Sequence, residues 1–275
     1  MQLTLGHYYH GNSVLHRLDP RIKIIVVVLF MVVIFLLNHP IAIAAFGIFL
    51  FVMIAVAKVP LKSILRSVRA VLFIAIFAFI VNILTVDAGV VLWRLGSLTL
   101  STGGLWNGFK LALRLFYLVV TSSLFLTLTT TPIKIADGLE KLLKPLERLR
   151  FPAHELAMMM SIALRFVPTL VEETDKIMKA QSSRGANYDT GNIFQKAKGM
   201  VSMLVPLFVS SFKRADDLAI AMEARCYQGG TGRTKLHPLI LKTSDTLFFI
   251  GALVFIGILL TAEYMLPPLV FAGGI

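Results

Sequence analysis

The chain alternates long apolar runs with short charged segments. A helix needs about 20 mostly apolar residues to cross the hydrocarbon core of a bilayer. Five runs approach that length, and we interpret them as membrane spans: 22–37, 41–57, 70–86, 111–130 and 246–262. Asn38-His39-Pro40 separates the first two and predicts a tight hairpin. The pattern predicts an all-α integral membrane protein with a bundle of about five transmembrane helices.

Between the fourth and fifth runs, charged residues are mixed with apolar ones, which predicts about three amphipathic helices. The first covers 132–149 and should bend or end at Pro145, because proline removes a helical hydrogen bond. We therefore expect three parts: an N-terminal membrane bundle of about four spans over 1–131, a cytoplasmic coupling-helix domain over 132–244, and a C-terminal transmembrane helix over 245–275.

The other two helices of this segment, at about 152–184 and 191–225, share one plan. Each is apolar in its first half and charged in its second. Each has a proline in its apolar half, Pro168 or Pro206, which is either a hinge or a tolerated kink. Arg165 lies in the first apolar half, and an arginine at a bilayer centre costs roughly 2.5–3.5 kcal/mol. We therefore expect these helices to lie against protein or along the membrane surface; two additional spans, seven in total, are the alternative.

Both long helices end in an arginine between small residues: Ser183-Arg184-Gly185 and Ala224-Arg225-Cys226. One interpretation is structural, since a cation suits the negative end of the helix dipole and a following glycine suits a left-handed cap. After Arg225 the nearest glycines are Gly229 and Gly230. The other interpretation is that each guanidinium docks into a partner protein, because its rigid fork binds carboxylates or carbonyls at two points.

The net charge of +12 is distributed unevenly. The segment 132–244 holds 17 of the 27 basic residues, and others precede the first run or separate the second run from the third. Basic loops stay on the cytoplasmic side. We therefore expect a multi-pass protein of the cell membrane with a cytoplasmic N-terminus and an extracytoplasmic C-terminus. This distribution accounts for the charge without a nucleic-acid partner.

The sequence offers no catalytic set and no metal site. Cys226 is the only cysteine, and the six histidines are scattered. The glycine-rich stretch 229–235 lacks the Gly-Lys-Ser/Thr ending of a phosphate-binding loop. The chain is therefore not predicted to be an enzyme, and any energy from ATP has to come from other subunits.

Three stretches resemble the T components of energy-coupling factor transporters, the CbiQ-like family. The stretch 13–23 resembles the family's N-terminal signature and contains His16, Asp19, Pro20 and Arg21. The stretches 180–185 and 221–227 resemble its two Ala-Arg-Gly signatures. Ser183 stands where alanine is usual, and Cys226 stands where a small residue, often glycine, occurs. Both are small, so they preserve the placement of the arginines.

The resemblance implies the transmembrane coupling component of an ABC importer for vitamins or other micronutrients, with no cofactor in this chain. Two partner ABC ATPases bind ATP and Mg²⁺, and they receive Arg184 and Arg225 in grooves. A separate membrane protein, the S component, binds the substrate and rests on the apolar halves of the long helices. To this platform we assign five adaptable methionines, which could equally fill an intramolecular core: Met158, Met159, Met160, Met200 and Met203.

Two alternative functions remain open. A conventional ABC permease would itself form the substrate path, but Glu223-Ala224 and Gly229 match its Glu-Ala-Ala loop only at chance level. A membrane-embedded enzyme would need ionisable residues inside its spans. The predicted spans offer little beyond Asn82, Arg114 and a few hydroxyl groups.

Overall fold

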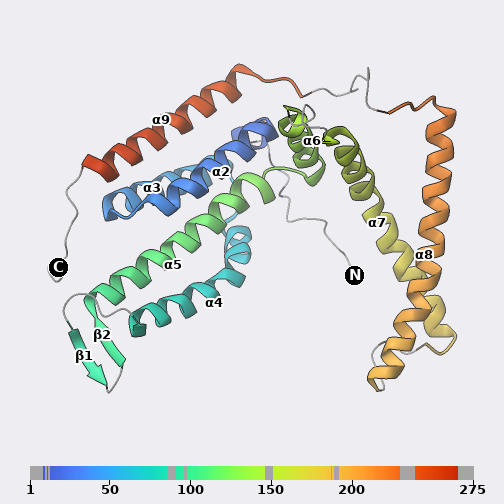
Figure 1. The fold of residues 1–275 in the computed structure, drawn as a ribbon, viewed down its shortest axis with the longest axis horizontal. Helices are drawn as coiled ribbons and strands as arrows, with labels where there is room; N and C mark the ends of the chain where they lie inside the picture. Colours follow the sequence, from blue (N-terminus) through green and yellow to red (C-terminus); the bar gives the residue numbers. More distant parts are fainter. Residues whose placement is uncertain are drawn as a thin grey trace. The chain divides into compact units, whose positions relative to one another are not determined.

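The computed structural model describes residues 9, 11, 13–85, 91–95, 98–145, 151–186, 188, 192–229 and 239–265. Within them the chain is helical apart from turns and one short hairpin (Figure 1), which confirms the predicted all-α fold. The described residues belong to two compact units, one within Glu140–Pro238 and the other within Gly6–Leu139 and Leu239–Ile275.

The larger unit is the membrane bundle. A π-helical turn, η1 (Ser123–Thr127), continues its helix α5. Two strands, β1 (Val91–Leu95) and β2 (Leu98–Ser101), form an antiparallel hairpin between α4 and α5 that the apolar pattern did not predict. The helices of this unit are α1 (Val14–Arg17), α2 (Pro20–Leu36), α3 (Pro40–Ala57), α4 (Leu61–Thr85), α5 (Thr102–Ser122), most of α6 (Pro132–Leu143) and α9 (Thr243–Met265).

All five predicted spans coincide with helices of the bundle, namely α2, α3, α4, α5 with η1, and α9. By length and composition, four described helices could cross a membrane, or five if the bent α4 counts as one span. Three of the four are predicted spans, and the fourth is α7 (Ala153–Ser183). The charges of α7 lie mostly in its second half, so the helix is apolar enough by composition to cross a membrane. Arg165 in its apolar half disfavours such a crossing. The number of spans, five or seven, therefore stays a prediction.

Aromatic rings fill the centre of the bundle. Phe30 of α2 is fully buried. Its ring lies 5.7 Å from Phe46, 5.2 Å from Phe49, 6.1 Å from Phe125 and 6.5 Å from Phe255, measured between centroids. Edge-to-face and tilted pairs at these separations are favourable. One phenylalanine thus joins α2, α3, η1 and α9 in a single core.

The predicted hairpin at Asn38 and His39 is held by side chains from two other helices. The carboxylate of Glu263 in α9 accepts hydrogen bonds from the backbone N–H groups of Asn38 (3.0 Å) and His39 (2.8 Å). Arg114 of α5 donates to the carbonyl of Leu37 at 2.6 Å, which satisfies the C-terminal end of α2. This end of the bundle is therefore closed by charge-assisted hydrogen bonds.

Three helix limits differ from the prediction. α5 begins at Thr102 rather than near residue 111. α4 begins at Leu61 rather than near residue 70, and it bends by 55° between its segments Leu61–Arg69 and Val71–Thr85. The first segment is amphipathic, so a search for apolar runs overlooked it. α6 ends at Leu143, and Lys144 and Pro145 follow in a tighter 3₁₀ turn, because proline cannot donate the next α-helical hydrogen bond. Residues 146–149 of that predicted helix lie outside the described residues.

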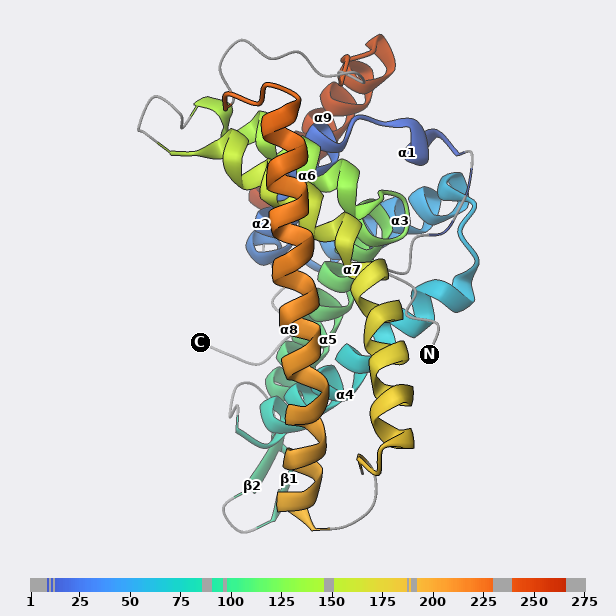
Figure 2. The ribbon, with the colours of Figure 1, turned by 90° about the vertical axis from the view of Figure 1, so that its right-hand side faces the viewer.

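The smaller unit contains two long helices side by side (Figures 1 and 2), α7 with 31 residues and α8 (Ile193–Ala224) with 32. The limits at 152 and 191 were predicted to within two residues. A capping box of Asn192 and Gln195 starts α8. An ion pair of 2.8 Å joins Arg214 Nη2 of α8 to Glu173 Oε2 of α7. The pair is partly exposed, so it aligns the helices more than it stabilises them.

Candidate functional site

Helix α7 ends at Arg184 in a regular cap. The N–H of Gly185 donates to the carbonyl of Ser182 at 3.0 Å, and the N–H of Ala186 donates to Gln181 at 3.0 Å. Gly185 has φ +88°, a left-handed conformation that glycine adopts without steric cost. This pair of bonds is the Schellman motif. The predicted left-handed cap at Gly185 is therefore present.

Helix α8 ends in the same motif at Arg225, but without a glycine. The N–H of Cys226 donates to Glu223 at 2.8 Å, and the N–H of Tyr227 donates to Met222 at 3.1 Å. Cys226 itself has φ 57°. The expectation that Gly229 or Gly230 would cap this helix was wrong, because the hydrogen-bond geometry requires the left-handed residue directly after Arg225.

The two arginines thus occupy equivalent positions, each at the C-cap of a long helix. Both are exposed, together with Ser183, Gly185 and Cys226. Among the described residues, none forms a hydrogen bond or ion pair with either guanidinium. The dipole at a helix C-terminus favours the cation but leaves its five N–H donors available. Each helix therefore presents a guanidinium that can bind an acceptor on another protein.

The five methionines assigned to the platform lie in the first halves of α7 and α8. Met159, Met160 and Met200 are 53%, 41% and 56% exposed, whereas Met158 and Met203 are half-buried. None of them belongs to a closed core.

The methionines are part of a larger apolar face, which agrees with the apolar first halves expected from the sequence, although its other members were not named there. On α8 the face recurs every three or four residues, a helical spacing that could have identified it. Its other members are 41–69% exposed: Val201, Leu204, Val205, Phe208, Val209 and Phe212. An exposed apolar face of this extent indicates contact with lipid or with another protein.

Pro168 and Pro206 both lie inside their helices. A proline has no N–H, so the carbonyl groups of Leu164 and Ser202, one turn earlier, lose their helical donors. Neither helix ends there. The missing hydrogen bond makes each helix easiest to bend at its proline. The role of the two prolines as hinges stays a prediction.

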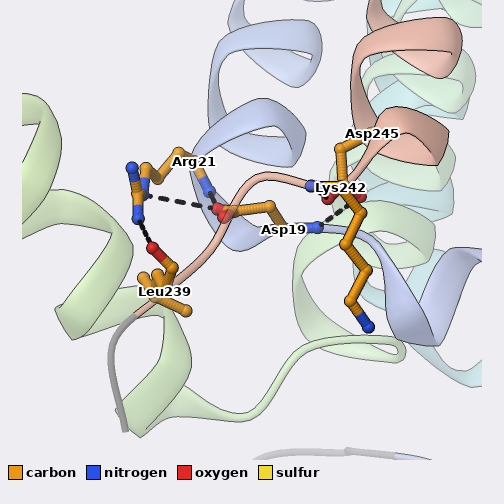
Figure 3. Close-up of polar contacts among 5 residues, drawn as sticks. All are labelled: Asp19, Arg21, Leu239, Lys242 and Asp245. Atoms are coloured by element: carbon orange, nitrogen blue, oxygen red, sulfur yellow. Dashed lines mark hydrogen bonds and ion pairs between the residues drawn. The ribbon is translucent and has the colours of Figure 1, made fainter.

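Two residues of the N-terminal signature join the segment before α9 in a polar cluster at the start of α2 (Figure 3), in which Asp19 and Asp245 are buried. We call this cluster the polar clamp: Asp19, Arg21, Leu239, Lys242 and Asp245. Asp19 caps α2 by accepting the N–H of Arg21 at 2.9 Å, and Pro20 occupies the first turn. Arg21 Nη2 donates to the carbonyl of Leu239 at 2.6 Å. The signature therefore holds the segment that leads into α9.

Asp245 is the centre of the polar clamp. It is 2% exposed, and its two carboxylate oxygens accept the backbone N–H groups of Asp19 (3.1 Å) and Lys242 (2.9 Å). One carboxylate thereby joins the first span to the last across 226 residues of sequence. Sequence reasoning missed Asp245; its only signal is an acidic residue at the beginning of an apolar run.

His16 and Lys23 complete this end of the bundle. His16 is buried and lies 2.7 Å from Ser13 Oγ and 2.9 Å from the carbonyl of Tyr9 through its two ring nitrogens. Lys23 is 1% exposed, and its ammonium donates to the Thr129 carbonyl (3.1 Å), Thr129 Oγ1 (3.3 Å) and Thr130 Oγ1 (2.9 Å). Lys23 is one of the basic residues at the start of the first span, and three oxygen acceptors there replace its water.

Within the described residues, no three His, Cys, Asp or Glu side chains gather as metal ligands. The geometry of the described sites is that of binding surfaces and structural contacts: exposed arginine caps, an apolar face, and a polar clamp built on two buried carboxylates. Together with the membrane bundle, these features define a multi-helix membrane component with an exposed helical pair.

Comparison with known proteins identifies the class. A family model described as "Cobalt transport protein" (CbiQ) matches residues 11–236. A relative from Acidaminococcus fermentans is 50% identical over 245 residues, 89% of this chain and 91% of the relative. Relatives from Ruminiclostridium cellulolyticum (46% over 263 residues, 96% and 98%) and Bacillus subtilis (45% over 257 residues, 94% and 97%) are similar. All three are named "Energy-coupling factor transporter transmembrane protein EcfT".

The chain therefore belongs to the CbiQ family and, within it, to the transmembrane components of energy-coupling factor transporters. The resemblance found in the sequence is confirmed. The relatives are transporter components and not enzymes, which sets aside the membrane-enzyme alternative.

The matched caps predict opposite effects of two substitutions. Gly185→Ala should destabilise the end of α7 by about 1 kcal/mol, and Cys226→Gly should stabilise the end of α8 by about the same amount, because only glycine adopts φ above 0° freely. A methyl group at residue 185 would meet no atom within 4 Å, so backbone strain alone is tested. Hydrogen exchange of the last-turn amides measures both changes; shifts of the same sign would contradict this account of the caps.

The polar clamp predicts a stability effect at Asp245. Asp245→Asn leaves one of the two backbone N–H groups facing an amide N–H₂ group, which should lower the free energy of unfolding by about 1–3 kcal/mol. Thermal unfolding in detergent measures the loss. Asp216→Asn on the exposed surface of α8 removes the same charge and should change stability by no more than about 0.5 kcal/mol. Equal losses in the two variants would refute the clamp.

Proposed function

We propose that this chain is the coupling component of an ATP-driven importer of vitamins or other micronutrients. It transmits the motion of two ABC ATPase subunits, which bind ATP and Mg²⁺, to an S component that binds the substrate. The observation that carries the proposal is the pair of matching caps, which present Arg184 and Arg225 from two adjacent helices of nearly equal length.

Each cap supplies a docking point for one ATPase. Arginine suits this use because its guanidinium is always charged and binds two oxygens at once. The small residues beside the arginines allow a partner backbone to approach closely: Ser183, Gly185, Ala224 and Cys226. A rigid helix that ends at the docking point then carries any displacement of the ATPase along its axis.

The S component rests on the apolar face of α7 and α8. Methionine side chains adapt to different surfaces, and the exposed phenylalanines and valines of α8 extend the contact area. Pro168 lies between the methionines of α7 and Arg184, and Pro206 lies within the apolar face of α8, before Arg225. They are the positions at which each helix would bend when the ATPases close.

The proposed orientation follows the positive-inside rule, with the N-terminus and the arginine caps in the cytoplasm and the C-terminus outside. A conventional permease would instead form the substrate path within its own bundle. The two functions differ in their partners: the coupling component purifies with two ATPases and a small membrane protein, and the permease purifies with ATPases and a solute-binding protein.

The docking role predicts the behaviour of a double variant. Arg184→Ala with Arg225→Ala should leave membrane insertion intact but weaken ATPase binding more than a hundredfold, since each hydrogen-bonded charge contributes about 1.5–3 kcal/mol. Co-purification of the ATPases and substrate uptake by whole cells measure the loss. Lys179→Ala with Lys213→Ala removes two exposed charges from the same helices and is the matched control. Normal uptake by the arginine variant would exclude the docking role.

The platform predicts a different loss. Replacing Met158, Met159 and Met160 with Asp should abolish recovery of the S component and spare the ATPases, because three carboxylates would have to be desolvated in the contact. Replacement of the same three by Leu keeps the surface apolar and should retain the S component. Recovery of the S component with the Asp variant would show that it binds elsewhere.

A further inference from the structure

The first segment of α4, Leu61–Arg69, carries a row of cations. Lys62, Arg66 and Arg69 are spaced by four and three residues, so they share one face of the helix. All three are exposed. The sequence has no acidic residue between Lys58 and Val86, so this face has no counter-charge on its own helix.

These cations border a cavity of about 650 Å³ that is lined by α3, α4 and α5. Beyond the cations its walls are almost entirely apolar, with Phe51 and Ile54 from α3, Leu72 from α4 and Phe116 from α5. The cavity therefore has a cationic end and an apolar interior.

A second cavity of about 320 Å³ continues the apolar interior between α4 and α5. The two cavities share Val68, Leu72 and Phe116 as lining residues. Together they form an apolar channel along α4 that starts at the three cations. The 55° bend of α4 sets the cationic segment at an angle to the span, as expected for a segment that lies along the membrane interface.

We propose that this site binds one anionic phospholipid, with its phosphate at Lys62, Arg66 and Arg69 and one acyl chain in the channel lined by Leu72 and Phe116. Basic residues beside a membrane attract anionic headgroups, and basic pockets between transmembrane helices are a known form of lipid site. A soluble anion would leave the apolar channel unfilled, whereas a phospholipid matches both parts. The bound lipid would brace α4, which otherwise packs mainly along α5.

The charge of the site can be tested on the purified full-length chain in mild detergent, by native mass spectrometry during titration with phosphatidylglycerol or phosphatidylcholine of the same chain length. The wild type should bind phosphatidylglycerol more tightly. Lys62→Gln with Arg66→Gln and Arg69→Gln should lose about fivefold per cation, or roughly a hundredfold in all. Lys176→Gln with Lys179→Gln and Lys198→Gln removes the same charge from α7 and α8 and should bind normally. Arg66→Gln alone, with a fivefold loss, serves if the triple variant does not insert.

The channel is tested by a substitution that leaves the charges in place. Leu72→Trp should fill it and weaken phosphatidylglycerol binding severalfold, whereas Phe73→Trp, at a residue that is 77% exposed and outside both cavities, should not. Equal binding of the two lipids by the wild type, an equal loss in the α7 and α8 control, or full displacement of the lipid by inorganic phosphate would each overturn the proposal. Because the site lies in the bundle, its failure would leave the proposed coupling role intact.

Discussion

The structure depends on two carboxylates, one near each end of α9. Asp245 accepts backbone N–H groups at the start of α2, and Glu263 accepts two more at the hairpin that leads into α3. At a rise of about 1.5 Å per residue, 18 residues separate them by about 27 Å, close to the ~30 Å of a bilayer's hydrocarbon core. Asp245 is 2% exposed, so little water competes for its carboxylate. Glu263 is partly exposed and is held by two charge-assisted hydrogen bonds. The last span is thereby tied to the first hairpin at both ends.

Such internal contacts hold the bundle together, whereas the described part of the smaller unit has few of them. In the bundle, the polar clamp and the aromatic core around Phe30 fix the helices against one another. The described part of the smaller unit buries Ala153, Ala157 and Gly199 but leaves most of its apolar face exposed. A closed bundle combined with an open helical pair suits a protein whose pair receives partners.

Much of the arrangement was predictable because its causes are local. Apolar runs located the five long helices of the bundle, and the limits of α7 and α8 follow from Pro152 and from the small residues after Arg184 and Arg225. Predictions failed where the local signal was weak or misleading. The amphipathic start of α4 has no apolar run, and the left-handed residue after Arg225 is Cys226 rather than a glycine, because cap geometry takes precedence over residue preference at that position.

By itself, the sequence determined the helices, the family and the two arginine ends, because helix length, periodicity and capping depend on residues close together in the chain. Only the tertiary structure decided where the buried polar groups find partners. The Lys23 ammonium donates to Thr129 and Thr130, more than 100 residues away, and the backbone N–H of Asp19 donates to the Asp245 carboxylate at a separation of 226. The cavity beside Lys62, Arg66 and Arg69 likewise exists only because α3, α4 and α5 meet there. Such contacts depend on how helices pack in three dimensions, and no local pattern encodes them.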